Sequence, residues 1–205
     1  MDMVTERDSV RRKLSAYFEA PAVKLLTKVG VSPNALTFLG VLTASIVAYL
    51  LSEGYFLLGS MSLLMSALFD QLDGALARAT GRVTRFGGFF DSVVDRISEF
   101  VVFFGLLLFY LEGSNIIQLA LIFVASGTSM IVSYIRARAG GFRVDCAVGV
   151  ITRTERVIIL VVVFAVGEWW LGAITVGLTV IASLSVITLV QRVLHVQRAL
   201  CESDN

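Results

Sequence analysis

The sequence carries little charge for its length, little proline and few potential soft metal ligands. Only 16% of its 205 residues are Asp, Glu, Lys or Arg, whereas roughly a quarter are charged in an average soluble domain. It has two prolines, one histidine and two cysteines. Cys146 and Cys201 stand far apart with no metal-ligand spacing, which is typical of free thiols. The shortage of charge argues against a soluble globule, and the lack of a basic stripe on a soluble face argues against nucleic-acid binding.

Apolar residues make up 57% of the chain and are concentrated in long runs. A helix that crosses a bilayer needs roughly 20 such residues. The second and fifth runs are shorter, so we expect each to extend into polar sequence at one end, with that end facing protein or a water-filled cavity. The pattern predicts an all-α integral membrane protein with six transmembrane helices, at Ala35–Leu51, Phe56–Phe69, Phe89–Leu111, Ile116–Ile135, Val157–Val166 and Leu171–Val190.

The positions of the basic residues indicate how these helices cross the membrane. All 17 Lys and Arg residues lie in the N-terminal segment, around the connections between the second and third and the fourth and fifth runs, or near the C-terminus. The other three connections contain Glu53, Glu112 and Glu168 and no basic residue. By the positive-inside rule, both termini and the even-numbered connections face the cytoplasm. We therefore expect a multi-pass protein of the cell membrane.

The segment before the first run has an amphipathic pattern. Ser9–Lys28 mixes five basic residues with leucines and aromatic residues, which favours a helix lying on an anionic cytoplasmic leaflet over a solvated basic tail. Gly30–Asn34 then breaks the chain, and Ser32 or Asn34 is expected to cap the next helix. The predicted organisation is an interfacial segment at 1–30, a six-helix transmembrane domain at 31–198 and a short cytoplasmic tail at 199–205.

Four aspartates stand at helical spacing on both sides of the second connection. Asp70 and Asp73 are three residues apart, and Asp91 and Asp95 are four apart, so each pair shares one face of a helix. Gly81 and the Gly87–Gly88 pair would let the chain turn back, so that two antiparallel helices bring the four carboxylates together near the cytoplasmic boundary. Pairing with arginine explains only some of them; the candidate partners are Arg78, Arg82, Arg85 and Arg96.

Clustered carboxylates at a membrane boundary suit a specific chemistry. An ionised Asp in a membrane helix costs several kcal/mol unless it is paired or metal-bound. Hard oxygen ligands favour Mg²⁺ or Mn²⁺, and four carboxylates supply enough charge for two such ions. Together with nearby arginines they form a site for a pyrophosphate, at which metal neutralises the phosphate oxygens and one carboxylate accepts a proton from an attacking hydroxyl.

These residues resemble the signature of the CDP-alcohol phosphotransferase family, D-x-x-D-G-x-x-A-R, eight residues, then G-x-x-x-D-x-x-x-D. Eight fixed positions at fixed gaps make a strong signal. Six spans with cytoplasmic ends also fit what the family implies, so the resemblance covers essentially the whole chain. All of the fixed positions are met, by Asp70, Asp73, Gly74, Ala77, Arg78, Gly87, Asp91 and Asp95.

The resemblance implies a role for each matching residue. The four aspartates would hold two metal ions, with Asp95 also the proton acceptor, and the donor would be CDP-diacylglycerol. Gly74 would let the nucleotide approach the helix backbone, and Arg78 and Thr84 would contact the CDP part. The start of the first span would also touch the nucleotide, although Asn34 and Thr37 suit simple helix capping as well. The family also implies a homodimer. The residues of this second nucleotide element are Asn34, Ala35, Leu36 and Thr37.

Arginines outside the signature point to the acceptor. As a set they favour a pocket for a phosphate dianion, which Arg grips through paired hydrogen bonds. Any one of them suits contact with lipid headgroups equally well. An acceptor that already carries phosphate is therefore expected. The candidates lie at cytoplasmic ends of the last three spans: Arg136, Arg138, Arg156 and Arg192.

The sequence around these arginines is similar to prokaryotic phosphatidylinositol-phosphate synthases and their archaeal ether-lipid relatives. In those enzymes the acceptor is inositol 3-phosphate, and its phosphate would be held here by Arg136, Arg156 and Arg192, with Arg138 near them. Thr152 departs from the acidic residue common at its position. Glycerol 3-phosphate, the acceptor of phosphatidylglycerophosphate synthases, is phosphorylated too and stays an alternative, as does an ether-linked lipid.

Two further interpretations compete with this one. A cation transporter would use the same aspartates as an ion path, but it predicts polar residues on both sides of the membrane midplane and internal repeats. A scaffold without chemistry leaves four carboxylates unexplained. His195, the only histidine, is expected to be a cytoplasmic-surface side chain rather than a catalytic residue.

Overall fold

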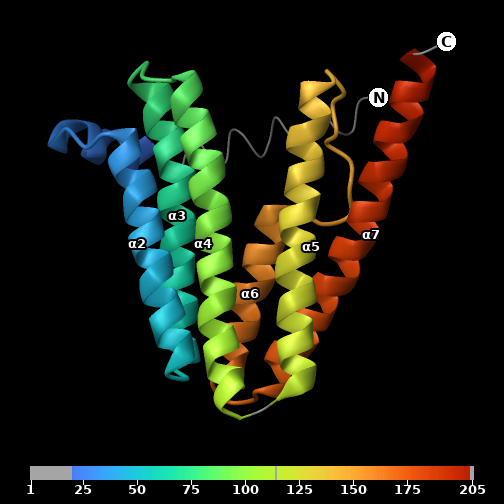
Figure 1. The fold of residues 1–205 in the computed structure, drawn as a ribbon. Helices are drawn as coiled ribbons and strands as arrows, with labels where there is room; N and C mark the ends of the chain where they lie inside the picture. The colour runs from blue at the N-terminus through green and yellow to red at the C-terminus, as the bar shows by residue number, and fades with distance from the viewer. Residues whose placement is uncertain (1–19, 114, 204–205) are drawn as a thin grey trace. The chain divides into compact units, whose positions relative to one another are not determined.

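The computed structural model describes residues 20–113 and 115–203. Residues 20–29 are helical, and these ranges contain no β-strand, so the expected all-α class is confirmed. Residues 9–19 of the expected interfacial helix and 204–205 of the expected tail lie outside the described residues. The remaining helices are α2 (Pro33–Ser52), α3 (Phe56–Ala79), α4 (Arg85–Glu112), α5 (Ile116–Gly141), α6 (Arg153–Gly167) and α7 (Gly172–Ser203) (Figure 1).

The helix boundaries follow local signals in the sequence. The helix at 20–29 ends at Gly30, whose φ of 75° is in the left-handed region, and Val31 N–H then donates to Leu26 O at 3.1 Å, the pattern of a Schellman cap. Pro33 occupies the first turn of α2, and Ser32 Oγ accepts a hydrogen bond from Ala35 N–H at 3.2 Å. Ser32 is therefore the N-cap, and Asn34 lies within the helix.

The two short apolar runs are extended as expected. α3 continues past Phe69 to Ala79 and α6 begins at Arg153, four positions before Val157. Within the described residues, three helices are long and apolar enough to cross a membrane, namely Pro33–Ser52, Ile116–Gly141 and Gly172–Glu202. α6 has only 15 residues, and α4 carries Asp95, Arg96 and Glu99 in its interior. The six-span topology and its orientation stay predictions.

The chain divides into two compact units. The boundaries between them fall within α2, α3 and α4, so each unit contains part of each of these helices. Unit 1 comprises Met1–Thr43 and Met65–Asp95. Its hydrophobic core is formed by Val23, Leu36, Ala75 and Leu76. Ser66 Oγ on α3 donates to Gly40 O on α2 at 3.1 Å and ties these two helices together.

Unit 2 comprises Ala44–Leu64 and Arg96–Asn205. Within it α5 and α6 both pack against α7 (Figure 1). The α4 backbone lies close to α2 at Gly105. A Cβ atom added there would lie only 2.3 Å from Ala48 O. Phe56 and Phe109 pack edge to face with ring centroids 4.9 Å apart. Unit 2 thus has its own apolar core.

Candidate active site

Three of the four predicted aspartates converge in unit 1. Asp70 lies on the C-terminal part of α3, and Asp91 and Asp95 lie one turn apart on the N-terminal part of α4. Each contributes one carboxylate oxygen to a group whose members all lie within 4.8 Å of one another. The Oδ1 atom of Asp95 is shielded from solvent. The sequence spacing therefore predicted the convergence of these three residues correctly.

A tight connection between α3 and α4 produces this arrangement. Gly81 has a φ of 65°, and Arg82 N–H donates to Ala77 O at 2.9 Å, which closes the end of α3. Thr84 Oγ1 then accepts a hydrogen bond from Gly87 N–H at 2.9 Å and caps α4. The prediction that Gly87–Gly88 takes part in the turn is wrong, because this cap places both glycines inside the first turns of α4.

Asp73, the fourth aspartate, has a different environment. Its side chain is buried, with 5% of the residue exposed. Its Oδ2 atom accepts a hydrogen bond of 2.6 Å from Thr37 Oγ1 on α2, and Thr37 is itself 6% exposed. The structure thus separates the carboxylates into a convergent group of three and one that is bonded to the neighbouring helix.

The group of three has the chemistry of a divalent cation site. Three carboxylates this close repel one another unless a cation balances them. Carboxylate oxygens are hard ligands of the kind that Mg²⁺ and Mn²⁺ prefer. Because the three oxygens are close enough to share one ion, the residues fit the metal that the sequence predicts.

The predicted nucleotide contacts are distributed unevenly around this group. A Cβ atom at Gly74 would have only Arg78 Nη1 within 4 Å, at 3.3 Å, so the backbone of Gly74 borders an open face next to the Arg78 guanidinium. Asn34 and Ala35 are exposed at the start of α2. Leu36 is 2% exposed in the unit 1 core, so its side chain offers no surface to a ligand. Any contact of Leu36 with a nucleotide stays a prediction.

Two of the residues predicted to contact the nucleotide use their hydroxyl groups in other hydrogen bonds. Thr84 is exposed, but its hydroxyl caps α4. The Thr37 hydroxyl is engaged with Asp73. Any contact of these two residues with a nucleotide stays a prediction.

The predicted acceptor arginines lie in unit 2, where a group of guanidinium groups forms around Arg192. Arg192 is 3% exposed; its Nε donates to Val148 O at 2.9 Å and its Nη1 donates to Val132 O at 2.7 Å. Repulsion from Arg136, Arg156 and Arg96 acts on Arg192. Three of the four predicted arginines thus belong to this group. Arg138 is exposed and instead lies over the Phe142 ring, 4.7 Å from its centroid.

Arg156 and Glu99 form a buried ion pair that the sequence did not reveal. Arg156 Nε lies 2.7 Å from Glu99 Oε1, and Nη2 lies 3.0 Å from Oε2. Their side chains are 1% and 6% exposed. Glu99 follows Arg96 by three positions on α4, and an acidic residue inside an apolar helix was the only signal available.

The α5–α6 connection is held against α7 by three polar side chains of that helix. Thr188 Oγ1 accepts hydrogen bonds from Val150 and Ile151 N–H at 3.2 and 3.1 Å. Arg192 donates to Val148 O, and His195 Nε2 lies 2.9 Å from Asp145 O. His195 therefore contacts this loop, and its expected non-catalytic role stays a prediction.

Comparisons with known proteins found a matching family model and similar relatives. A family model described as CDP-alcohol phosphatidyltransferase matches residues 30–191. The archaetidylinositol phosphate synthase of Pyrococcus horikoshii is 37% identical over 178 residues, which cover 86% of this chain and 89% of that protein.

Two crystal structures of the phosphatidylinositol phosphate synthase of Mycobacterium tuberculosis are similar to this fold. The structure with CDP-DAG bound has a TM-score of 0.83 and 35% identity, and the match covers 88% of this chain and 94% of that one. The complex with manganese and citrate has a TM-score of 0.80 and 34% identity, with 87% and 88% covered.

Proposed function

Because the chain belongs to the CDP-alcohol phosphatidyltransferase family, we propose that this membrane transferase moves the phosphatidyl group of CDP-diacylglycerol to inositol 3-phosphate. The products are phosphatidylinositol phosphate and CMP. The observation that carries the proposal is the convergence of Asp70, Asp91 and Asp95 within 4.8 Å, in a motif that the family shares.

The donor and the metal are inferred from the site and from a relative. The Mycobacterium tuberculosis protein has been crystallised with CDP-DAG and with manganese, and the carboxylates of this chain suit the same ligands. Two Mg²⁺ or Mn²⁺ ions would be held by Asp70, Asp73, Asp91 and Asp95. When bound, they would neutralise phosphate oxygens and stabilise the charge of the leaving CMP.

The chain's own residues orient the donor and move one proton. Arg78 and the open backbone at Gly74 would hold the pyrophosphate and the cytidine end. The acceptor hydroxyl attacks the lipid-linked phosphorus, a new P–O bond forms, and the bond to the bridging oxygen breaks, so that its electron pair leaves with CMP. Asp95 accepts the hydroxyl proton. Its Oδ1 atom is shielded from bulk water.

The acceptor is inferred from the arginines of unit 2. A cationic group that suits a phosphate dianion is formed by Arg136, Arg156 and Arg192. Arg138 lies near Arg136, in the C-terminal part of α5. Relatives that match most of the chain are named for inositol phosphate products. Glycerol 3-phosphate as acceptor and an ether-linked lipid donor are the alternatives that a test must separate.

The proposed membrane arrangement completes this function. Six spans with cytoplasmic ends would place both the α3–α4 connection and the α5–α6 connection on the cytoplasmic side, where a soluble acceptor is available. The segment 1–30 would lie on the inner leaflet, 199–205 would form the tail, and two copies would form the homodimer. Cysteine labelling from either side of sealed vesicles tests the orientation, with Glu53 or Arg82 replaced by Cys in a variant whose Cys146 and Cys201 are replaced by Ser. Only Arg82→Cys should react from the cytoplasmic side.

The function is tested by CMP release from CDP-diacylglycerol. Purified protein is given inositol 3-phosphate, glycerol 3-phosphate, serine or free inositol in the presence of Mg²⁺. We expect release with inositol 3-phosphate and loss of that release when Arg156 or Arg192 is replaced by Ala while metal binding is retained. Preferential release with glycerol 3-phosphate would overturn the acceptor assignment. Ion flux across liposomes without CMP release would overturn the transferase.

A further inference from the structure

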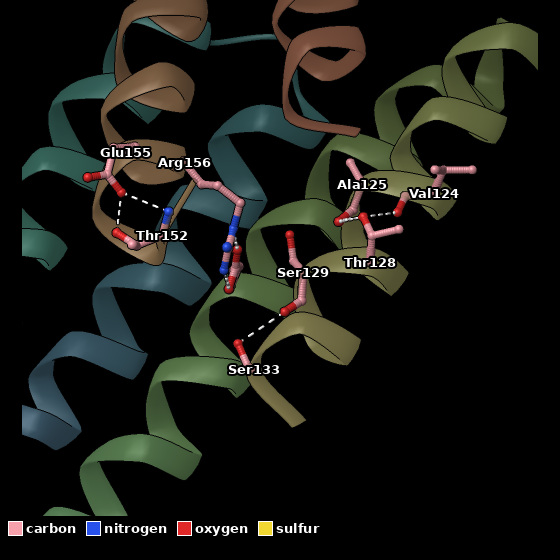
Figure 2. Close-up of polar contacts among 9 residues, drawn as sticks. Val124, Ala125, Thr128, Ser129, Ser133, Thr152, Glu155 and Arg156 are labelled. Carbon is pink, nitrogen blue, oxygen red and sulfur yellow. Dashed lines mark hydrogen bonds and ion pairs between the residues drawn. The ribbon is translucent and has the colours of Figure 1, made fainter. Parts of the chain in front are cut away.

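A buried carboxylate, that of Glu99, pairs with Arg156 in the arginine group of unit 2. Glu99 on α4 is 8% exposed and Arg156 on α6 is 1% exposed. Figure 2 shows the Arg156 side chain extending away from Thr152 and Glu155 at the start of its own helix. Burying two charges costs several kcal/mol for each ion before the attraction is counted. A gain in stability is therefore a weak explanation for a buried ion pair, and the presence of this one needs another explanation.

The geometry of the pair fixes the orientation of the Arg156 guanidinium. Glu99 engages one edge of the planar group, with Nε bound to Oε1 and Nη2 bound to Oε2. A guanidinium has five N–H donors, so this edge uses two of them. The plane and the direction of the other three donors are thereby set, which a single hydrogen bond does not achieve.

Charge gives a second reason for a carboxylate at this place. Arg96, Arg136 and Arg156 all lie near enough to repel Arg192. Three of these arginines, Arg96, Arg156 and Arg192, are buried or half-buried, and without an anion they would be strongly destabilised. One carboxylate offsets part of this charge and leaves the group net cationic, which is the state required to attract a phosphate dianion.

We propose that Glu99 is a positioning residue for the acceptor, holding Arg156 in the orientation in which it binds the acceptor phosphate. The inference rests on the proposed function. It adds a residue that makes no contact with either substrate and acts only through Arg156. The Arg192 guanidinium is likewise held in one orientation, by hydrogen bonds to the main-chain carbonyls of Val132 and Val148. The side-chain orientations of both buried arginines are therefore fixed before the acceptor binds.

The test is Glu99→Gln, which keeps the shape of the side chain and removes its charge. The amide nitrogen of Gln presents a donor to a guanidinium donor, so the two-point contact is lost. We expect the KM for inositol 3-phosphate to rise about tenfold, as for loss of one charged hydrogen bond, with the KM for CDP-diacylglycerol unchanged. Glu155→Gln is the matched control, since Gln at this capping-box position still accepts from Thr152 N–H.

A double-mutant cycle separates positioning from folding. Arg156→Lys alone is expected to raise the acceptor KM, and adding Glu99→Gln to it should raise that KM no further, because both changes disrupt one unit. Melting of each variant in detergent is measured alongside.

The outcomes are distinguishable. A fall in kcat or in melting temperature for Glu99→Gln with both KM values unchanged would show a structural pair only and overturn the inference, leaving the proposed function intact. An unchanged acceptor KM in Arg156→Ala would overturn the acceptor site and the inference together.

Discussion

Thr37 on α2 donates its hydroxyl hydrogen to Asp73 on α3 across 2.6 Å, and both residues are buried. The bond ties the start of the first long apolar helix to the helix that carries the metal-site motif. Asp73 is not one of the three aspartates whose carboxylate oxygens converge within 4.8 Å. A charged acceptor with a hydroxyl donor makes a stronger hydrogen bond than a neutral pair does, so this contact fixes the side chain of Asp73.

Replacing Thr37 by Val should therefore weaken the metal site without removing a ligand. We expect the Mg²⁺ concentration for half-maximal CMP release to rise about tenfold, the effect of losing one hydrogen bond to a charged group. Thr43→Val is the control on the same helix, because the Thr43 hydroxyl bonds only within α2, to Leu39 O at 2.7 Å. Equal Mg²⁺ dependence in the two variants would argue against a role for the Thr37–Asp73 bond.

The convergent aspartates should bind Mn²⁺ directly. Replacing Asp70 or Asp91 by Asn removes one charged ligand from a group of three, so purified protein should retain much less Mn²⁺, measured by electron paramagnetic resonance of the free ion. Glu53→Gln, in the exposed connection after α2, should bind Mn²⁺ like the unchanged protein. Undiminished Mn²⁺ binding in both Asn variants would place the metal elsewhere.

Arg136 offers the cleanest test of the cationic group, because it is exposed and its loss should not disturb packing. We expect Arg136→Ala to raise the KM for inositol 3-phosphate with little change in melting temperature, since one favourable charge contact with the phosphate is removed. The control is Arg198→Ala, which removes an exposed arginine on α7 and should leave the KM for inositol 3-phosphate unchanged. The same KM for both variants would separate Arg136 from the acceptor.

Thr188 should hold the α5–α6 connection in place. Its side chain is fully buried and accepts two backbone hydrogen bonds from Val150 and Ile151. Thr188→Val leaves these N–H groups without their acceptor at a cost of about 1–3 kcal/mol, so we expect a lower melting temperature and faster proteolysis at residues 142–152. Thr179→Val is the control, since that hydroxyl bonds Thr175 O on its own helix. Equal melting of the two variants would contradict the role.

Local signals in the sequence predicted much of the fold because they act over a few residues. Ser32 before Pro33 specified the start of α2, and the apolar runs located the helices. Gly81 ended α3 as expected, but Gly87–Gly88 misled the prediction. Glycine permits a turn without requiring one, and Thr84 had already started the helix.

Contacts between distant positions were beyond prediction from a single sequence. Helical spacing placed Asp70, Asp91 and Asp95 on facing surfaces, yet nothing in the spacing indicated that Asp73 faces Thr37. Glu99 and Arg156 are 57 positions apart, and their pairing depends on how α4 and α6 pack. The four hydrogen bonds between α7 side chains and the α5–α6 connection also depend on tertiary packing.

The central claim is that Asp95 accepts the proton of the acceptor in a metal-dependent transfer. Single-turnover CMP release from CDP-diacylglycerol with inositol 3-phosphate, measured for Asp95→Asn at saturating Mg²⁺, tests it most directly. We predict a loss on the order of 100- to 10,000-fold, the range for removal of a general base. CMP release at the unchanged rate would contradict it.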